Sequence, residues 1–278
     1  MLIEEALPTH FMARYSLDHL SELIARQPQS DDDLLDFVRG SLTGTCGNLY
    51  RHARITADRL PIPDIRLPDV AGAPLLDVGC NWGRWCVSAA RRGYRVVGID
   101  PSLPAVLAAR RVAARSGCAV HVIVGDGRHL PFRDGTFDVV FSYSVLQHFS
   151  PEDLRSCLAD IRRVLVPGGQ ALVQMPNRFG LRNLLQQVRR GLRQARQFEV
   201  RYWRPSHLQR VFEHGIGPST LETDGFFTLN AQRSDLDLLP MGAGLVVRLS
   251  EWLRAGSERL PWLRSLADSL YVRSSKVS

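Results

Sequence analysis

The 278-residue chain has very little lysine and no long apolar run. Lys276 is its one lysine, so arginine supplies almost all of the basic charge, and the net charge is +7. No apolar stretch approaches the ~18 residues that a membrane-spanning helix needs. Residues 1–10 lack the basic start and apolar core of a signal peptide, so we expect a cytoplasmic protein. The basic balance suits acidic partners, from phosphates and carboxylates to nucleic acid or anionic lipid.

Cysteine is also scarce, and its pattern excludes two further classes of protein. The five cysteines are odd in number, and no two of them form a Cys-x-x-Cys pair. This argues against both a disulfide framework and a zinc site. We therefore expect reduced thiols and no metal ion.

The most informative stretch is Leu75–Trp85, where a strand-like run is followed by a glycine-bearing turn and then a helix. Gly79 and Gly83 allow a ligand to approach the backbone, because a side chain there would collide with it. Asn81 stands where a glycine is more usual, and Asn tolerates the left-handed conformation. A helix that starts near Trp82 would point its first N–H groups and its positive dipole end at the ligand.

Two later runs also read as strands that end in acids, Tyr94–Asp100 and Val122–Asp126. Carboxylates at the ends of parallel strands describe a nucleoside pocket at one edge of a sheet. Asp100 follows Gly79 at a distance where a carboxylate can bind a ribose diol. Asp126 and the backbone of Gly127 could bind the amino edge of an adenine.

These motifs resemble those of the class I S-adenosylmethionine-dependent methyltransferases, most closely the small-molecule branch that includes quinone-biosynthesis enzymes. The match runs from about Pro74 to Pro176, and it includes the adenine motif 125–132, the fourth strand 137–142 and the turn 164–169. A nicotinamide dehydrogenase is disfavoured, because Gly79-x-x-x-Gly83 after Asp77 is not the Gly-x-Gly-x-x-Gly pattern.

The resemblance implies a fold, a cofactor and a set of binding residues. The fold is α/β, a Rossmann-like, seven-stranded, mostly parallel sheet with helices on both faces, an N-terminal helical segment and a C-terminal lid-like insertion. The cofactor is S-adenosyl-L-methionine, with S-adenosyl-L-homocysteine as product. The implied cofactor-binding residues are Asp77, Gly79, Cys80, Asn81, Gly83, Asp100, Pro101, Asp126, Gly127 and Ser142.

Alternating apolar patterns independently predict a parallel sheet with helices on both faces. We expect strands at 74–78, 95–99, 119–124, 137–143, 170–175, 221–229 and 269–273, and by resemblance the last is antiparallel and inserted beside the fifth. We expect a helix at 2–25 and a second helix that begins after Ser30 as its cap. Further helices are expected at 82–92, 103–115, 151–164, 181–196, 205–214 and 245–257. We divide the chain into an N-terminal segment or lid (1–70), a core (71–233 with 269–275) and a helical insertion or cap (234–268).

The loop after the fourth strand, 142–150, is expected to lie over the reacting methyl group. Its best candidate for a general base is His148, because a neutral imidazole accepts a proton near pH 7. The alternative is that His148 only holds the neighbouring helix in place. Tyr143 is a weaker catalytic candidate that could instead line the methionine end of the cofactor. Methyl transfer can also proceed without a base, because alignment and water exclusion supply much of the rate.

Candidate acceptor-binding residues come from three segments. Asn177 and Arg178 follow the fifth strand, and Arg178 could bind an anionic substrate or pair with a carboxylate. Tyr202 and Trp203 could form a pocket wall or a hydrophobic staple for the next helix. Tyr50, together with Tyr15, could belong to an N-terminal lid.

Residues 178–204 hold eight arginines against one acid, Glu199, and five spaced apolar residues. Such a basic helix can lie on an anionic membrane or pack on the core as a solvated helix. We expect a small-molecule acceptor, no stable nucleic-acid partner, and a monomer or homodimer.

The activity implied is methyl transfer to oxygen or nitrogen, with carbon less favoured, on a small molecule of a bacterial natural-product, cofactor or glycan pathway. The alternatives are an RNA methyltransferase, which the pI of ≈ 9.6 suggests, and a non-catalytic subunit that binds S-adenosylmethionine.

Overall fold

The computed structural model describes residues 30–227 and 231–277, apart from the side chains of residues 44–48. The helix predicted at 2–25, the segment 1–10 and Tyr15 lie outside the described residues.

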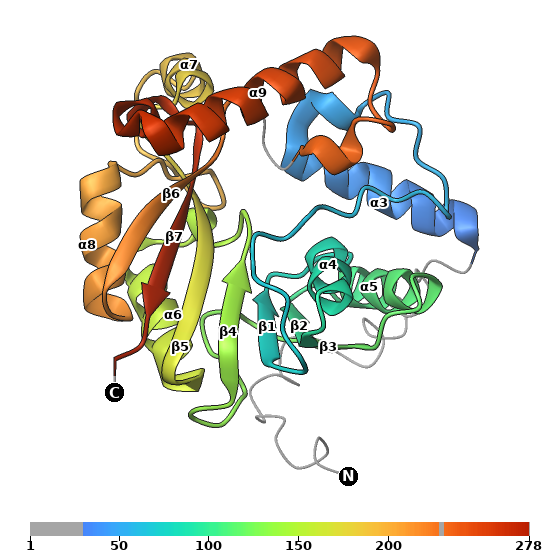
Figure 1. Cartoon of the computed structure of the whole chain (residues 1–278), viewed down its shortest axis with the longest axis horizontal. Coiled ribbons are helices and arrows are strands. Elements are labelled where there is room, and N and C mark those ends of the chain that lie inside the picture. The colour runs from blue at the N-terminus through green and yellow to red at the C-terminus, as the bar shows by residue number, and fades with distance from the viewer. Residues whose placement is uncertain (1–29, 228–230, 278) are drawn as a thin grey trace.

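A single seven-stranded sheet forms the centre of the molecule, in the order β3-β2-β1-β4-β5-β7-β6 (Figure 1). Its parallel strands are β1 (Pro74–Val78), β2 (Arg95–Asp100), β3 (Val120–Val124), β4 (Phe137–Ser142) and β5 (Leu165–Pro176). The last strand, β7 (Ser269–Ser275), lies antiparallel between β5 and β6 (Ser219–Gly225). The predicted fold class and the inserted antiparallel strand are therefore confirmed.

The strands are buried on both faces because helices cover both. In β1, Leu75 faces one apolar cluster with α4 (Arg84–Arg91), whereas Leu76 faces another with α6 (Pro151–Val164) and α8 (Pro205–Gly215). A continuous apolar run, rather than alternation with polar residues, is the signature of such a strand. The helix α5 (Leu103–Arg115) packs beside α4 and contacts β2 and β3.

Local capping chemistry sets where several helices begin. The helix α3 (Asp31–Cys46) opens with a capping box, since Ser30 Oγ accepts from Asp33 N at 3.1 Å and Asp33 Oδ2 accepts from Ser30 N at 3.0 Å. The short helix η1 (Gly47–Tyr50) follows it. Ser150 caps α6 by accepting from Asp153 N at 3.0 Å, with Pro151 at the first helical position.

Several predicted helices have different bounds in the structure: the helix expected at 245–257 is longer, Met241–Arg259, and two others are shorter. The helix expected from Trp82 begins at Arg84, because Gly83 just before it is left-handed. The helix expected at 181–196 is α7 (Leu181–Arg189), and it ends where Gly191 adopts a φ of 67°. Glycine in that conformation is a common helix terminator.

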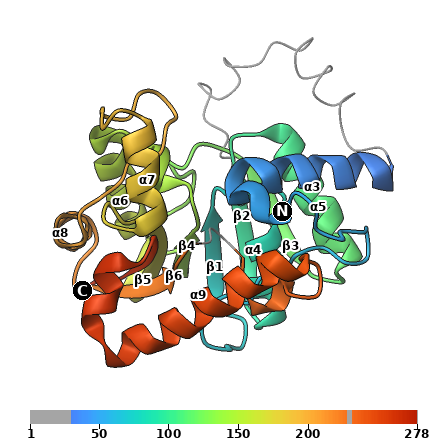
Figure 2. The ribbon, with the colours of Figure 1, turned by 90° about the horizontal axis from the view of Figure 1, so that it is seen from above.

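Above the carboxyl ends of the parallel strands lie residues 231–268, which we call the cap from here on and which begin three residues before the predicted cap (234–268). They contain η3 (Arg233–Asp235), α9 (Met241–Arg259) and η4 (Pro261–Leu266). Figure 1 shows the arrowheads of β1 and β4 pointing towards α9, and Figure 2 shows α9 running past that edge of the sheet. The segment 50–70 bonds to this cap: Arg54 N donates to Leu238 O at 2.8 Å, and Asp64 N to Gln232 Oε1 at 2.9 Å.

Candidate functional site

Three predicted acids gather at one edge of the sheet. Asp77 is the penultimate residue of β1, Asp100 ends β2, and Asp126 follows β3 by two residues. The strands β1, β2 and β3 pair in parallel, so their carboxyl ends lie together. The edge therefore carries a row of carboxylates beside the turn that precedes α4.

That turn is built from left-handed residues. Gly79, Asn81 and Gly83 have φ of 79°, 47° and 81°, which confirms that Asn81 sustains the left-handed conformation. Protein atoms near two of these residues already exclude a side chain, and the approach of a ligand to the turn stays a prediction. A Cβ on Gly79 would lie 2.2 Å from Val145 Cγ2, and a Cβ on Gly83 would lie 3.0 Å from Ala109 Cβ. Packing against the strand-four loop and α5 thus already requires glycine.

Asp100 holds this turn in place. Its Oδ2 accepts from Asn81 N at 2.9 Å, and its Oδ1 accepts from Ser102 N at 2.9 Å. Burial raises the pKa of Asp100, against the lowering effect of these two hydrogen bonds. Each carboxylate oxygen has two lone pairs, so one on each oxygen is left for a ligand donor.

Asp77 lies deeper than Asp100 and is almost fully buried. Cys86 Sγ lies 3.2 Å from Asp77 Oδ2 and donates to it. Burial raises the pKa of Asp77 to about 7, and the nearby charge of Asp100 raises it too. Among the described residues, no cationic group acts on the pKa of either acid. The site therefore places two acids in a poorly solvated position, where burial disfavours their ionised forms.

Asp126 differs because it already has a cationic neighbour. Arg128 Nε lies 3.0 Å from each carboxylate oxygen of Asp126, and Arg128 Nη2 lies 2.5 Å from Oδ2. Gly127 is buried, and a Cβ there would lie 2.8 Å from Val78 Cγ1. The adenine contacts predicted for these residues stay predictions. Of the other predicted cofactor residues, Cys80 is buried, its N–H donating to Ile99 O, and Pro101 is exposed.

Hydrogen bonds of two buried side chains fix the start of the strand-four loop. Ser142 is fully buried, and its hydroxyl donates to Val78 O at 2.8 Å, so it joins β4 to β1. Tyr143 is buried against Trp85, with ring centroids 4.6 Å apart, and its hydroxyl donates to Asp224 Oδ2 at 2.5 Å. Burial first, and then the charge of Asp224, raises the pKa of Tyr143 well above its ordinary value. This geometry favours a structural role for Tyr143 over a catalytic one.

His148 is engaged through both ring nitrogens. It lies in η2 (Leu146–His148), and its ring stacks on Phe198 at 4.2 Å. Nδ1 lies 2.7 Å from Phe198 O, which makes it the protonated nitrogen, and Nε2 then accepts from Gln147 Nε2 at 3.2 Å. Burial lowers the pKa of His148. The ring is thus a neutral imidazole that holds the loop against residues 197–201, and a role as base stays a prediction.

The structure brings four of the five predicted acceptor residues together, because Asn177 and Trp203 form a β-bridge and Arg178 N donates to Trp203 O at 2.8 Å. Tyr202 adjoins this bridge in sequence, whereas Tyr50 lies apart from it, against Asp235. Asn177 is fully buried, with its side-chain amide donating to Ser265 O and Ala267 O at 2.8 Å. Tyr50 is buried and donates to Asp235 Oδ2 at 2.6 Å. Trp203 packs in the core, with no described partner for its buried Nε1. These positions favour structural roles.

Arg178 and Tyr202 remain more accessible. Arg178 is exposed, and Tyr202 is half-buried with the Arg190 guanidinium 5.4 Å from its ring centroid. Contact of either residue with an acceptor stays a prediction.

A buried polar cluster at the same edge was missed by the sequence reasoning. Asp224 Oδ2 also accepts from Ser269 Oγ at 2.6 Å, and Arg66 Nη1 lies 3.3 Å from Asp224 Oδ1. Gln174 donates to Ser269 Oγ at 2.6 Å. The available signal was an acid near the end of a strand, the same as for Asp77, but the predicted sixth strand ran past it to residue 229.

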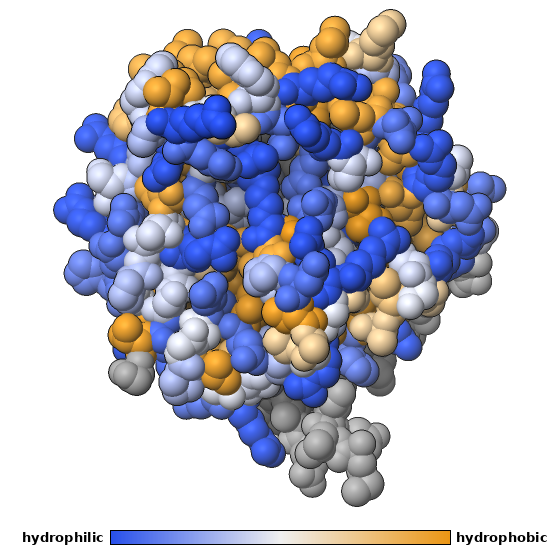
Figure 3. Space-filling view, viewed as in Figure 1, coloured by the Kyte–Doolittle hydropathy of each residue, from blue (hydrophilic) through white to orange (hydrophobic). Residues whose placement is uncertain are grey.

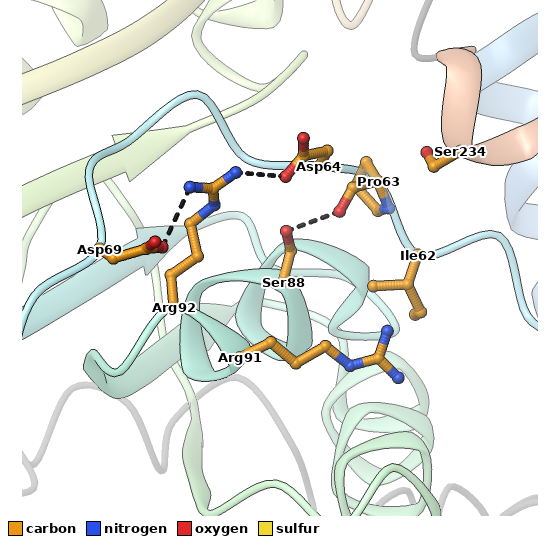
Figure 4. Close-up of a pocket in the computed structure, with 8 residues that line it drawn as sticks. All are labelled: Ile62, Pro63, Asp64, Asp69, Ser88, Arg91, Arg92 and Ser234. Atoms are coloured by element: carbon orange, nitrogen blue, oxygen red, sulfur yellow. Dashed lines mark hydrogen bonds and ion pairs between the residues drawn. The ribbon is translucent and has the colours of Figure 1, made fainter.

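Two cavities lie away from this edge, beside the carboxyl end of α4. The first has a volume of about 390 Å³, and Figure 4 shows Arg92 among its lining residues, with the guanidinium paired with Asp64 at 2.5 Å and with Asp69 at 3.1 Å. The second, of about 490 Å³, shares Ile62, Arg91 and Ser234 with it. Neither is lined by a predicted site residue.

The sheet order, the strand-end acids and the glycine turn define a Rossmann-like nucleoside-binding architecture. Residues 75–169 match the family described as methyltransferase domain, and this match and the fold support the resemblance to the class I S-adenosylmethionine-dependent methyltransferases.

Known proteins similar to the chain carry different functional names. The chain is 35% identical over 103 residues to probable tRNA methyltransferase 9B of Bos taurus, and this match covers 37% of the chain and 21% of that protein. It is 32% identical over 163 residues to demethylmenaquinone methyltransferase of Corynebacterium kroppenstedtii, covering 58% and 63%. The chain thus spans about a fifth of the first relative and under two thirds of the second.

Among solved structures, the fold is similar to a chain from the complex of the Haloferax volcanii Trm112 methyltransferase activator with a methyltransferase. The TM-score is 0.54 at 18% identity, covering 89% of this chain and 96% of that chain.

Proposed function

We propose that this chain binds S-adenosyl-L-methionine and transfers its methyl group to an oxygen or nitrogen of a small molecule, with carbon less favoured. The observation that carries the proposal is the pair Asp77 and Asp100, two buried acids at adjacent strand ends without a described cationic partner. A buried charge is costly unless it is paired, and a cationic nucleoside that offers a diol would pair it.

The described residues fit that cofactor. Asp100 keeps an acceptor lone pair on each oxygen for a ribose diol, and a cationic ligand would favour the ionised form of Asp77. When bound, S-adenosyl-L-methionine supplies an electrophilic methyl group on a sulfonium. The chain's own contribution is to bind, orient and exclude water, and buried Cys80 and Trp82 line the turn with apolar surface.

The small-molecule acceptor is supported by the match to demethylmenaquinone methyltransferase and by the motifs of the core. A bacterial natural-product, cofactor or glycan pathway is the corresponding setting. We keep His148 as the candidate base, although direct displacement needs none.

Calorimetric titration of S-adenosyl-L-methionine into the purified chain tests the binding step. We expect binding by the parent and by Asp138→Ala, which removes an exposed acid of β4. Asp100→Asn keeps the shape of the side chain but removes its charge, and should weaken binding by at least about tenfold, as expected for lost charge-assisted hydrogen bonds. A parent that does not bind would overturn the proposal.

A second candidate, an RNA methyltransferase, is supported by the 35% identity to the tRNA methyltransferase relative and by the pI of ≈ 9.6. Incubation with methyl-labelled cofactor plus either total tRNA or a small-molecule extract separates the two. Label that nuclease digestion releases from the tRNA fraction would favour RNA, whereas label in the extract favours the first proposal. Binding without transfer to either would point to a non-catalytic subunit.

A further inference from the structure

The helix α7 is amphipathic, but its apolar face points outward and its polar face inward, the opposite of a typical surface helix in a globular protein. Its apolar residues Leu181, Leu184, Leu185 and Val188 are exposed, and the exposed fraction of Val188 is 62%. Its buried residues are polar, Asn183 and Gln187. A helix that served only to cover the core would turn its apolar face inward.

Specific hydrogen bonds fix this orientation. Asn183 Nδ2 donates to Asn177 O at 2.8 Å and to Asp268 O at 2.7 Å. Gln187 Nε2 donates to Arg178 O at 2.8 Å. Asp268 Oδ1 accepts from the N–H groups of Arg182 and Asn183 at the start of the helix. The hydrogen bonds of the buried polar face therefore hold the leucines of α7 on the outside.

The cap adds a second exposed apolar stripe. Met241, Leu245, Leu249 and Trp252 are spaced by four, four and three residues, which places them on one face of α9. All four are exposed, Trp252 by 69%. Beyond the end of α9, Trp262 in η4 is exposed by 62%.

The end of the cap contacts the start of α7. Asp268, just after η4, bonds to the start of α7, and Asn177 Nδ2 donates to Ser265 O. Figure 3 shows apolar side chains gathered along the top, where Figure 1 places α7 and α9. We call this surface the apical face, defined by Leu181, Leu184, Leu185, Val188, Met241, Leu245, Leu249, Trp252 and Trp262.

Arginines without a described ion pair accompany these apolar residues. Arg178, Arg189 and Arg196 belong to the α7 region, and Arg248 and Arg259 to α9; all five are exposed. The neighbouring acids already have partners among the described residues, since Glu199 binds Arg193 at 2.6 Å and Glu258 binds Arg254 at 3.2 Å. The apical face is thus both apolar and positively charged.

We propose that the apical face docks on an anionic phospholipid bilayer. Leucine and tryptophan side chains enter the boundary between headgroups and acyl chains, while guanidinium groups bind the phosphates. The same positive charge opposes pairing of this face with a second copy of itself. The docking does not depend on the proposed methyl transfer, although the face lies on the strand-end side of the molecule.

Flotation of the full chain with vesicles tests this docking. We expect it to float with vesicles of phosphatidylcholine and phosphatidylglycerol, and not with phosphatidylcholine alone. Raising the salt from 0.05 to 0.5 M, values chosen to span the screening range, should weaken binding. If the parent does not float with the anionic vesicles, the proposal is overturned.

Matched variants locate the docking face. Arg189→Glu and Arg248→Glu should each weaken binding at least about fivefold, whereas Arg133→Glu, in the loop at the opposite edge of the sheet, should not. Leu184→Glu should also release the chain, in contrast to Val277→Glu at the far end of β7. Equal losses in variants and controls would contradict the assignment.

Light scattering of the same proteins tests the competing occupant. We expect Leu184→Glu to leave the molecular mass unchanged. A parent dimer that this variant dissociates would overturn membrane docking in favour of self-association. Because no cofactor is present, these outcomes are independent of the calorimetric result.

Discussion

Asp77 is a buried acid beside a second buried acid, Asp100, and this makes its ionisation unfavourable in the folded protein. Burial raises its pKa from 3.8 to about 7. A group with a raised folded pKa stabilises the protein fully below its unfolded pKa, and that stability is lost as pH rises through the folded pKa. The contribution of Asp77 to the free energy of unfolding should therefore decrease as the pH rises from about 4 to about 8.

Asp77→Asn removes the titration while keeping nearly the same shape. Between pH 4 and pH 8, we expect the free energy of unfolding of the parent to decrease by on the order of 4 kcal/mol relative to that of the variant. Structural relaxation around the ionised Asp77 would reduce this difference. Urea denaturation at several pH values measures this difference. His148, whose pKa is lowered, is present in both proteins and cancels. Parallel stability curves would show that Asp77 does not titrate in this range.

Sequence reasoning at the residue scale succeeded where a backbone conformation or a strand end identified the residue. Asn81 and the acids Asp77 and Asp100 were found in this way. The reasoning was weaker for Asn177, Tyr143 and Tyr50, because their buried partners, such as Asp224 and Asp235, are more than 50 residues away in sequence. Chemical type alone cannot distinguish a polar side chain that binds a ligand from one satisfied by a distant backbone or carboxylate.

At the scale of elements, the apolar patterns predicted all seven strands, and the family resemblance predicted that the last one is antiparallel. The run of β1 is apolar on both faces and therefore clear, whereas β6 carries Glu222, Thr223 and Asp224 and was predicted with the wrong bounds. The orientation of α7 was open in the sequence, where an apolar stripe normally predicts an inward face. What turns it outward is the bonding of Asn183 and Gln187 to carbonyl groups of residues 177, 178 and 268, which no local pattern reveals.

The polar interface beneath α7 makes a prediction of its own. Asn183→Ala leaves the buried carbonyl groups of Asn177 and Asp268 without their side-chain donor, so it should destabilise the protein by about 1–3 kcal/mol. Gln186→Ala, on the same helix but with no side-chain hydrogen bond among those described, should change stability by less than about 0.5 kcal/mol. Chemical denaturation compares the two. Equal effects would mean that helix propensity, not the buried amide, determines the loss.

At the scale of the whole molecule, the described part of the N-terminal segment and the cap both bond to the core. Arg66 lies 3.3 Å from Asp224 of β6 and 3.5 Å from Glu251 of α9. Tyr50 and Arg84 reach Asp235 of the cap from the N-terminal segment and from α4. Our three-part division of the chain stays a prediction, but these contacts indicate that the parts unfold together.

Asp235 offers the sharpest test of that cooperativity. Its Oδ2 accepts from Tyr50 Oη at 2.6 Å and from Gln232 N at 3.0 Å, and it lies 3.8 Å from Arg84 Nη2. Asp235→Asn removes the buried counter-charge, and losing one partner of a buried ion pair costs about 3–5 kcal/mol. Because the bonds join cap, N-terminal segment and core, calorimetry should show one transition at a lower temperature. Asp237→Asn, an exchange of the same kind two residues away in the cap, should melt like the parent. A second, early transition would instead mean that the cap unfolds alone and that these contacts do not couple it to the sheet.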